Sequence, residues 1–191
     1  VAGPLPHVVT AGASVVLFMS ELCALYAGES LPALSLQYAD FAAWEAGEAQ
    51  VAERARGLSW WVSHLGVSPA ALELATDRPR PARVTYSGAV VPFSLDASVY
   101  AAVCEAASQL GVTVFAMLLA PYYALLHHYT QQEEIVVGTP AAGREFPEVE
   151  PLVGFFVNTL PLMVRVQGGD RVCDLVRRVQ QVVAGGLEHQ A

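Results

Sequence analysis

The pattern of apolar and polar positions changes along the chain, and each change predicts an element. The first stretch, from Ser14 to about Ala27, is apolar on nearly every side. A helix of that kind is normally buried between layers, and a serine at its start is a common N-terminal cap. We therefore predict a buried helix here, capped by the Ser14 side chain.

Further helical patterns follow in the middle and at the end of the chain. From about Asp40 to Leu65 the sequence predicts a helix with a polar middle, and Gly57 offers a break. Three more helices are predicted: one from Asp96 or Ser98 to Leu110-Gly111, one over 113–130 that Pro121 kinks, and an amphipathic one over 170–189.

Three stretches have the composition of strands. They are rich in β-branched and aromatic residues, and they lie at 84–95, 133–140 and 153–166. Gly88 in the first of them is a candidate bulge, and the second is expected to be short and buried. Because these strands alternate with helices, the sequence predicts a layered protein of the α/β or α+β class.

Composition narrows the function classes. The 191 residues are 54% hydrophobic and 15% charged, enough for a substantial core, and the net charge of -8 argues against a nucleic-acid partner. The apolar run at 106–132 has the length of a membrane span, but Gly111, Pro121 and two histidines interrupt it, so we expect no membrane segment. The three cysteines are Cys23, Cys104 and Cys173, and they are too dispersed for a disulfide framework or a metal cluster. This predicts a reduced, cytoplasmic protein with no metal site.

Four segments carry motifs in a characteristic order and spacing. They read PHVVTAGAS (6–14), QYADFAAWE (37–45), IVVGTPAAGR (135–144) followed by LVGFFVNTLPLMVR (152–165), and LEHQA (187–191). This set resembles the condensation domains of nonribosomal peptide synthetases, whose patterns are HHxxxDG, YxDFAxW, GxFVNT and HQDxPFE. The resemblance covers nearly the whole chain, and its two central segments are specific.

The resemblance implies a two-lobed fold like that of chloramphenicol acetyltransferase. Family domains are more than twice as long as this chain, so we expect a middle fragment. Residues 1–75 would hold the end of the N-terminal lobe with the active-site motif, and 76–191 most of the C-terminal lobe. The family's active site lies in a tunnel between the lobes.

The resemblance also implies a reaction and its partners. A carrier-bound acceptor amine attacks the thioester of a carrier-bound donor, which forms an amide in secondary-metabolite or antibiotic biosynthesis. The expected partners are donor and acceptor peptidyl carrier proteins and neighbouring synthetase domains. No cofactor is expected to bind directly, because the phosphopantetheine arms belong to the carrier proteins.

The first motif departs from the family pattern. The second histidine, usually given the proton-transfer role, falls on His7, but Pro6 replaces the first histidine and Ala11 the aspartate. In the family this aspartate organises the loop through an ion pair. Gly12 matches, and we assign Ala11, Gly12 and Ser14 to the active-site loop. His7 can be a working base in a loosened site, a relic in a silent scaffold domain, or a core histidine in a protein of another family.

Several other residues have both a functional and a structural interpretation. By resemblance Asn158 and Thr159 are candidates to line the substrate tunnel, with strand packing as the alternative. The pair His127-His128 imitates part of the first motif, but it lies at the end of an apolar helix. A coenzyme A-dependent acyltransferase of the same fold would carry HxxxD, which Ala11 also breaks, and nothing favours an epimerisation domain. The residues do not indicate the donor, the acceptor, the stereochemistry or the product.

Overall fold

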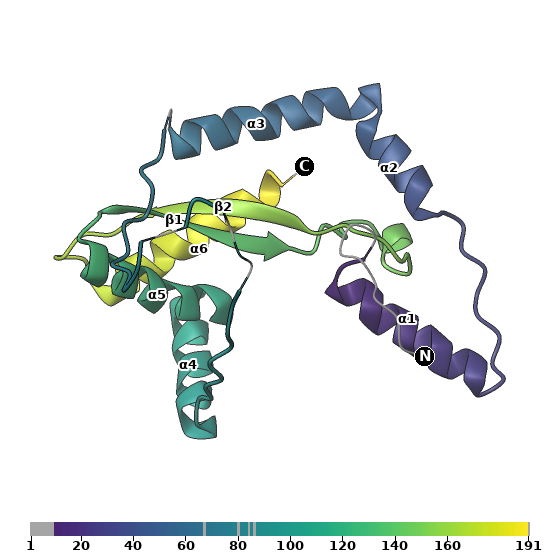
Figure 1. Ribbon diagram of the computed structural model, residues 1–191, viewed down its shortest axis with the longest axis horizontal. Helices are drawn as coiled ribbons and strands as arrows, with labels where there is room; N and C mark the ends of the chain where they lie inside the picture. The colour runs from purple at the N-terminus through teal and green to yellow at the C-terminus, as the bar shows by residue number, and fades with distance from the viewer. Residues whose placement is uncertain (1–9, 67, 80, 84, 86, 191) are drawn as a thin grey trace. The chain divides into compact units, whose positions relative to one another are not determined.

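The computed structural model describes residues 10–66, 68–79, 81–83, 85 and 87–190. Helices dominate, and one short pair of strands lies late in the chain (Figure 1). The elements in order are α1 (Gly12–Tyr26), α2 (Tyr38–Ala46), the 3₁₀ turn η1 (Glu48–Gln50), α3 (Val51–Leu65), α4 (Ala97–Leu110), α5 (Val114–Thr130), β1 (Glu134–Ala141), the 3₁₀ turn η2 (Pro147–Val149), β2 (Asn158–Arg165) and α6 (Val172–Glu188).

The chain divides into two compact units that interleave along the sequence. Unit 1 comprises residues 1–63, 138–160 and 189–191, and unit 2 comprises 64–137 and 161–188. The division into lobes at residues 75 and 76 stays a prediction.

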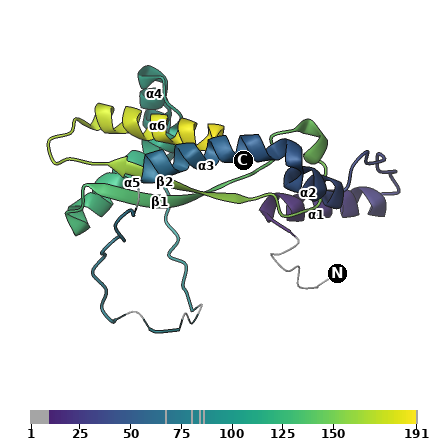
Figure 2. The same ribbon diagram turned by 90° about the horizontal axis from the view of Figure 1, so that it is seen from above.

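Strands β1 and β2 pair with each other and lie side by side in both ribbon views (Figures 1 and 2). The Val166 N–H, just past β2, donates to the Glu133 carbonyl, just before β1, at 2.7 Å. The start of one strand therefore lies beside the end of the other, so the pair is antiparallel. Burial along β2 alternates as a strand with one buried face requires, with Leu160, Leu162 and Val164 almost fully buried.

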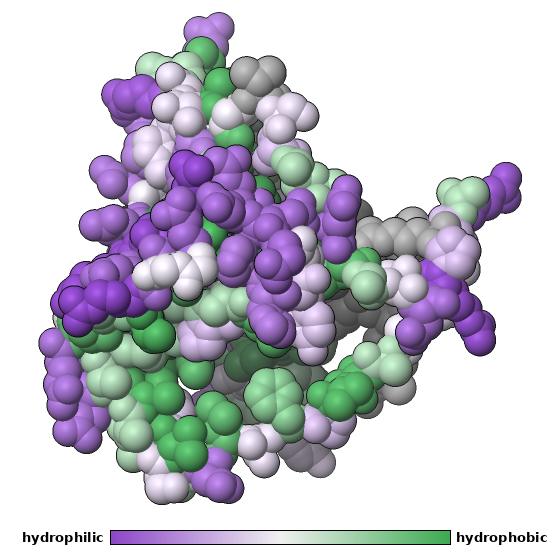
Figure 3. Space-filling view, turned by 90° about the vertical axis from the view of Figure 1, so that its left-hand side faces the viewer, coloured by the Kyte–Doolittle hydropathy of each residue, from purple (hydrophilic) through white to green (hydrophobic). Residues whose placement is uncertain are grey.

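Unit 2 has its core between α5 and α6, which pack against each other. Tyr123 of α5 is fully buried, and its hydroxyl donates to the Leu162 carbonyl at 2.7 Å. Burial raises the pKa of the Tyr123 hydroxyl, which keeps it protonated as a donor. Buried residues of α6 form the facing side: Leu175, Val176, Val179, Val183 and Gly186. Large apolar side chains of α4 and α5 are also exposed, such as those of Tyr100 and Phe115. Figure 3 shows one face of the molecule, on which hydrophobic residues are green.

The predicted boundaries of α4 and α5 are confirmed because their end signals are local. Asp96 is the N-cap residue of α4, and Gly111 ends it in the left-handed conformation, with φ of 66°. Thr113 caps α5 by accepting the Ala116 N–H at 3.2 Å. Helix α5 runs from Val114 to Thr130 with Pro121 inside it.

Two predictions about the first half of the chain are wrong. The helical stretch after Asp40 breaks at Gly47, not at Gly57, because Gly47 turns to an extended conformation at the end of α2. Gly57 is buried within α3, where a glycine weakens a helix without ending it. Helix α1 is not buried between layers, since Val16 is 72% and Tyr26 95% exposed.

The predicted strand at 84–95 is also wrong in the part of it that the structure describes. Residues 87–95 form neither a strand nor a helix, and Val90, Val91 and Phe93 are exposed. A strand needs a ladder partner, and β-rich composition alone does not provide one. For the same reason the strand predicted from Val153 begins only at Asn158.

Candidate active site

Ser14 connects the first motif to the GFFVNT segment within unit 1. Its side chain is fully buried, its hydroxyl donates to the Gly154 carbonyl at 2.7 Å, and it accepts the Gly154 N–H at 3.0 Å. The predicted capping role is therefore wrong. Ala11 is the N-cap residue of α1 and no side chain caps the helix, because the Ser14 hydroxyl is committed to a residue 140 positions away.

Arg144 is the second member of this cluster. Its guanidinium donates to the Ser14 hydroxyl at 3.1 Å, which fills that hydroxyl's capacity of one donated and two accepted bonds. It also donates to three main-chain carbonyls, those of Val149, Glu150 and Leu152. The guanidinium carbon lies 4.2 Å from the centre of the Phe156 ring. Burial lowers the pKa of the Arg144 guanidinium, and the nearby Glu150 carboxylate partly offsets this.

We call Ser14, Arg144 and Gly154 the Ser14 cluster. In the sequence, Arg144 is simply the last residue of the IVVGTPAAGR segment. The signal that could have identified its role is an arginine directly after the glycine of GTPAAG, since a guanidinium has five N–H donors and can bond several carbonyls at once.

Two glycines make the cluster possible. Gly143 has φ of +65°, and a Cβ there would overlap the Phe156 carbonyl. A Cβ at Gly154 would overlap the Tyr38 ring. Both positions therefore require glycine, one for its conformation and for space and the other for space alone.

The second motif packs against the same segment. The Tyr38 hydroxyl donates to the Phe155 carbonyl at 2.8 Å, and the Tyr38 ring meets the Phe156 ring edge-on at 5.1 Å. Asp40 completes a capping box at the start of α2, since its carboxylate accepts the Gln37 N–H at 2.8 Å. The QYADFAAWE and GFFVNT segments and the first turn of α1 thus meet in one cluster.

Ala11 stands next to this cluster in sequence and is 4% exposed. Among the described residues, the hydrogen-bond acceptors of Arg144 are all neutral oxygens. The arrangement is therefore a half-buried cation held by carbonyls and a hydroxyl. His7 and Pro6 lie outside the described residues.

Comparison with known proteins identifies the family. The family model described as Condensation domain matches residues 5–191. The chain belongs to the condensation-domain family. The sequence resemblance is thereby confirmed.

Curated relatives of this condensation-domain chain are large synthases. It is 38% identical over 186 residues to tyrocidine synthase 3 of Brevibacillus parabrevis, covering 97% of this chain and 3% of that protein. It is 36% identical over 184 residues to surfactin synthase subunit 1 of Bacillus subtilis (strain 168), covering 96% of this chain and 5% of that protein. The chain therefore spans a small part of the length of these relatives.

Solved structures confirm the predicted fold class, a partial condensation-domain fold of mixed helix and sheet. The X-domain from teicoplanin biosynthesis superposes with a TM-score of 0.86 at 27% identity, covering 97% of this chain and 44% of that one. The first condensation domain of the CDA synthetase gives a TM-score of 0.71 at 26% identity, covering 96% of this chain and 42% of that one.

Asn158 and Thr159 lie at the start of β2 in this condensation domain, both exposed. The Asn158 amide donates to the Gln190 carbonyl at 2.7 Å, and its oxygen accepts the Thr159 N–H at 2.8 Å. These contacts fix the last described residues of the chain to β2. The proposed tunnel-lining role of both residues stays a prediction.

The segment after α6 is also held by two tryptophans of α3. The His189 ring stacks on Trp60 with centroids 4.6 Å apart and planes 7° from parallel. The Trp61 indole N–H donates to the His189 carbonyl at 2.7 Å. His189 of the LEHQA motif therefore packs on α3 within unit 1.

Two further features concern the described part of the chain, its metal-ligating side chains and its apolar helices. Those residues contain no group of three or more His, Cys, Asp or Glu side chains that could hold a metal ion. Among them no single helix is long and apolar enough to cross a membrane; α4 and α5 pass that test only together, by length and composition, and meet at a bend of 102°.

Proposed function

We propose that this chain is part of a domain that condenses two carrier-bound acyl groups into an amide. The observation that carries the proposal is the Ser14 cluster, which ties the residues after the first motif to the GFFVNT segment. The synthase relatives support the same reaction, and they favour it over the silent scaffold.

The chemistry requires few groups. The acceptor amine attacks the donor thioester carbonyl, the new C–N bond forms, the C–S bond breaks, and the proton released by nitrogen ends on the departing sulfur. An imidazole, whose ordinary pKa is near 6.5, suits this proton transfer at neutral pH. We assign it to His7, on the motif alone.

The proposed role of Ser14 and Arg144 is positioning. The first turn of α1 follows the motif directly, and three hydrogen bonds to the Ser14 hydroxyl fix that turn. Without the family's aspartate at position 11, this hydroxyl is the side-chain partner that Arg144 has in the loop. Asn158 and Thr159, four and five residues past Gly154, are proposed to line the path of the substrates.

The proposed partners follow from the reaction. Donor and acceptor carrier proteins deliver the substrates on phosphopantetheine arms, and neighbouring synthetase domains load them. We place this reaction in the cytoplasm.

The test is single-turnover amide formation in the complete synthetase module, with loaded donor and acceptor carriers and intact-protein mass spectrometry. His7→Ala is expected to slow product formation by roughly 100-fold, the usual loss when a general base is removed. His128→Ala is the matched control, because His128 is exposed on α5 of unit 2, and its rate should equal that of the parent.

A second variant separates a damaged site from a silent one. Pro6→His with Ala11→Asp restores the family pattern and is expected to raise the rate. If neither the parent nor this variant forms amide while the carriers still bind, the domain is a scaffold and the proposal is wrong. If His7→Ala matches an active parent, the proton-transfer role of His7 is wrong.

A further inference from the structure

A pocket lies in unit 1 that the proposed condensation site does not use. It has a volume of about 310 Å³ and is lined by residues of α2, of the segment before it, and of η2 and its flank: Leu36, Asp40, Phe41, Trp44, Phe146, Glu148 and Val149. This volume is at the lower end of the range for ligand pockets, about 300–1,000 Å³.

The pocket wall is aromatic. The Trp44 and Phe146 rings lie 5.3 Å apart with planes at 86°, and Phe41 lies 5.7 Å from Trp44. Trp44 is 46% and Phe146 43% exposed, so large parts of both rings are available to a ligand. The faces of such rings carry partial negative charge and attract cations.

Two acidic residues are among those that line the pocket. Asp40 is held in place because its carboxylate accepts the Gln37 N–H, and Glu148 lies in η2. None of the described residues that line the pocket is basic. The lining therefore combines aromatic rings with carboxylates and leaves the complementary positive charge to a ligand.

We propose that this pocket binds an arginine side chain of a partner polypeptide. A guanidinium is planar, stacks on aromatic rings and bonds carboxylates in pairs, so it matches both components of the lining. Leu36 and Val149 add apolar surface for the residues that flank the arginine. Binding in this pocket does not depend on catalysis at the proposed condensation site.

Binding to the 191-residue chain tests the proposal directly. The chain carries three tryptophans, and fluorotryptophan labelling gives each a fluorine NMR signal, with Trp44→Phe identifying that of Trp44. The probe is the peptide acetyl-Leu-Arg-Leu-amide, and its citrulline analogue is the neutral control of nearly the same shape. We expect a saturable shift of the Trp44 signal with the arginine peptide and about tenfold weaker binding of the citrulline peptide.

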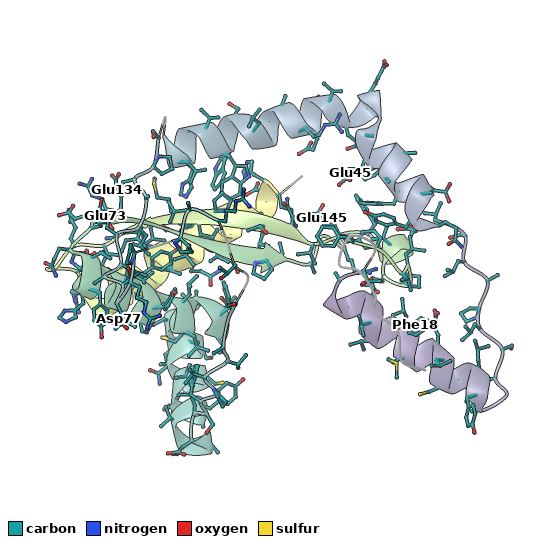
Figure 4. The ribbon with its side chains drawn as sticks, viewed as in Figure 1. Phe18, Glu45, Glu73, Asp77, Glu134 and Glu145 are labelled. Carbon is teal, nitrogen blue, oxygen red and sulfur yellow. The ribbon has the colours of Figure 1, made fainter. Side chains whose placement is uncertain are left out.

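Variants separate charge from apolar contact. Asp40→Asn with Glu148→Gln removes both carboxylates, while Asn keeps an acceptor for the α2 cap, and it is expected to abolish the preference for arginine. Glu45→Gln with Glu48→Gln makes the same charge change at residues that do not line the pocket, and should leave the preference unchanged; Glu45 is labelled on α2 in Figure 4.

Three results would overturn the inference. The first is no saturable shift with the arginine peptide, and the second is equal binding of the two peptides. The third is equal binding of acetyl-arginine-amide and the peptide, which would remove the partner polypeptide from the proposal.

Discussion

Unit 1 and unit 2 are each stabilised internally, and the interactions within them differ in kind. In unit 2, α5 and α6 pack apolar faces around Tyr123 and Leu162, which are both fully buried. In unit 1, the first turn of α1 is fixed by directional bonds between the buried Ser14 hydroxyl, Gly154 and the half-buried Arg144. Apolar packing tolerates small shifts in position, whereas hydrogen bonds depend on distance and angle. In unit 1, apolar packing around Phe156 is therefore joined by directional bonds that fix the first turn of α1.

The largest effect is expected from Tyr123→Ala in unit 2. It removes a fully buried ring and its bond to Leu162, and loss of an aromatic ring from a core costs about 3–5 kcal/mol. Urea denaturation followed by circular dichroism measures the loss, and hydrogen exchange of α5 and α6 locates it. Tyr122→Ala, at the next and exposed position, is the control and should change little. Equal losses for the two variants would contradict an apolar core centred on Tyr123.

A smaller and more local effect is expected from Ser14→Ala in unit 1. It leaves the Gly154 N–H and carbonyl and one Arg144 donor without their partner, which costs about 1–3 kcal/mol. Hydrogen exchange should quicken at residues 149–156 and in the first turn of α1. Ser20→Ala lies on the same helix but is exposed, so it serves as the control. Unchanged exchange in Ser14→Ala would show that directional bonds do not hold the first turn of α1.

The smallest effect concerns the surface of unit 2 and depends on pH. Bonds from Arg178, at 2.8 and 3.1 Å, and from the Gln167 N–H hold the pKa of Asp170 at about 2. A lowered pKa means that the ionised form is stabilised in the folded state. This contribution is therefore complete above about pH 4 and is lost as the pH falls toward the folded pKa. Nearby positive charge on His127 acts in the same direction.

The measurement is the urea midpoint from about pH 6 to about pH 2. In Asp170→Asn the midpoint should be slightly lower at neutral pH and should fall less on acidification. Glu134→Gln is the matched control, because Glu134 is exposed at the start of β1. The same decline in parent and Asp170→Asn would exclude this ion pair as the cause.

Sequence reasoning succeeded where the deciding signals are local. Asp96, Gly111 and Thr113 mark helix ends within a few residues, so α4 and α5 were predicted closely. It failed where a partner distant in sequence decides. Ser14 has the local signature of a cap, but two bonds to Gly154 outweigh the single bond that a cap would make.

The segment at 87–95 teaches the same lesson for strands. Its valines and phenylalanine fit a pleated sheet, yet in the described residues no neighbour supplies a ladder. The family could be predicted because its motifs are short stretches of sequence whose order and spacing are visible along the chain. The role of Arg144 could not be predicted, because three of its acceptors are main-chain carbonyls. Every residue has such a carbonyl, so the sequence does not mark these acceptors.

The interleaving of the two units has a consequence for synthesis on the ribosome. Unit 1 draws on residues 138–160 and 189–191 as well as the first 63, and His189 and Gln190 dock on α3 and β2. During translation, the Ser14–Gly154 hydrogen bonds can therefore form only after Gly154 has emerged from the ribosome. The Trp60–His189 contact can form only later still, after His189 has emerged. Because closing such long loops slows folding and leaves apolar surface open, α1 and α3 of the nascent chain are natural clients for a chaperone.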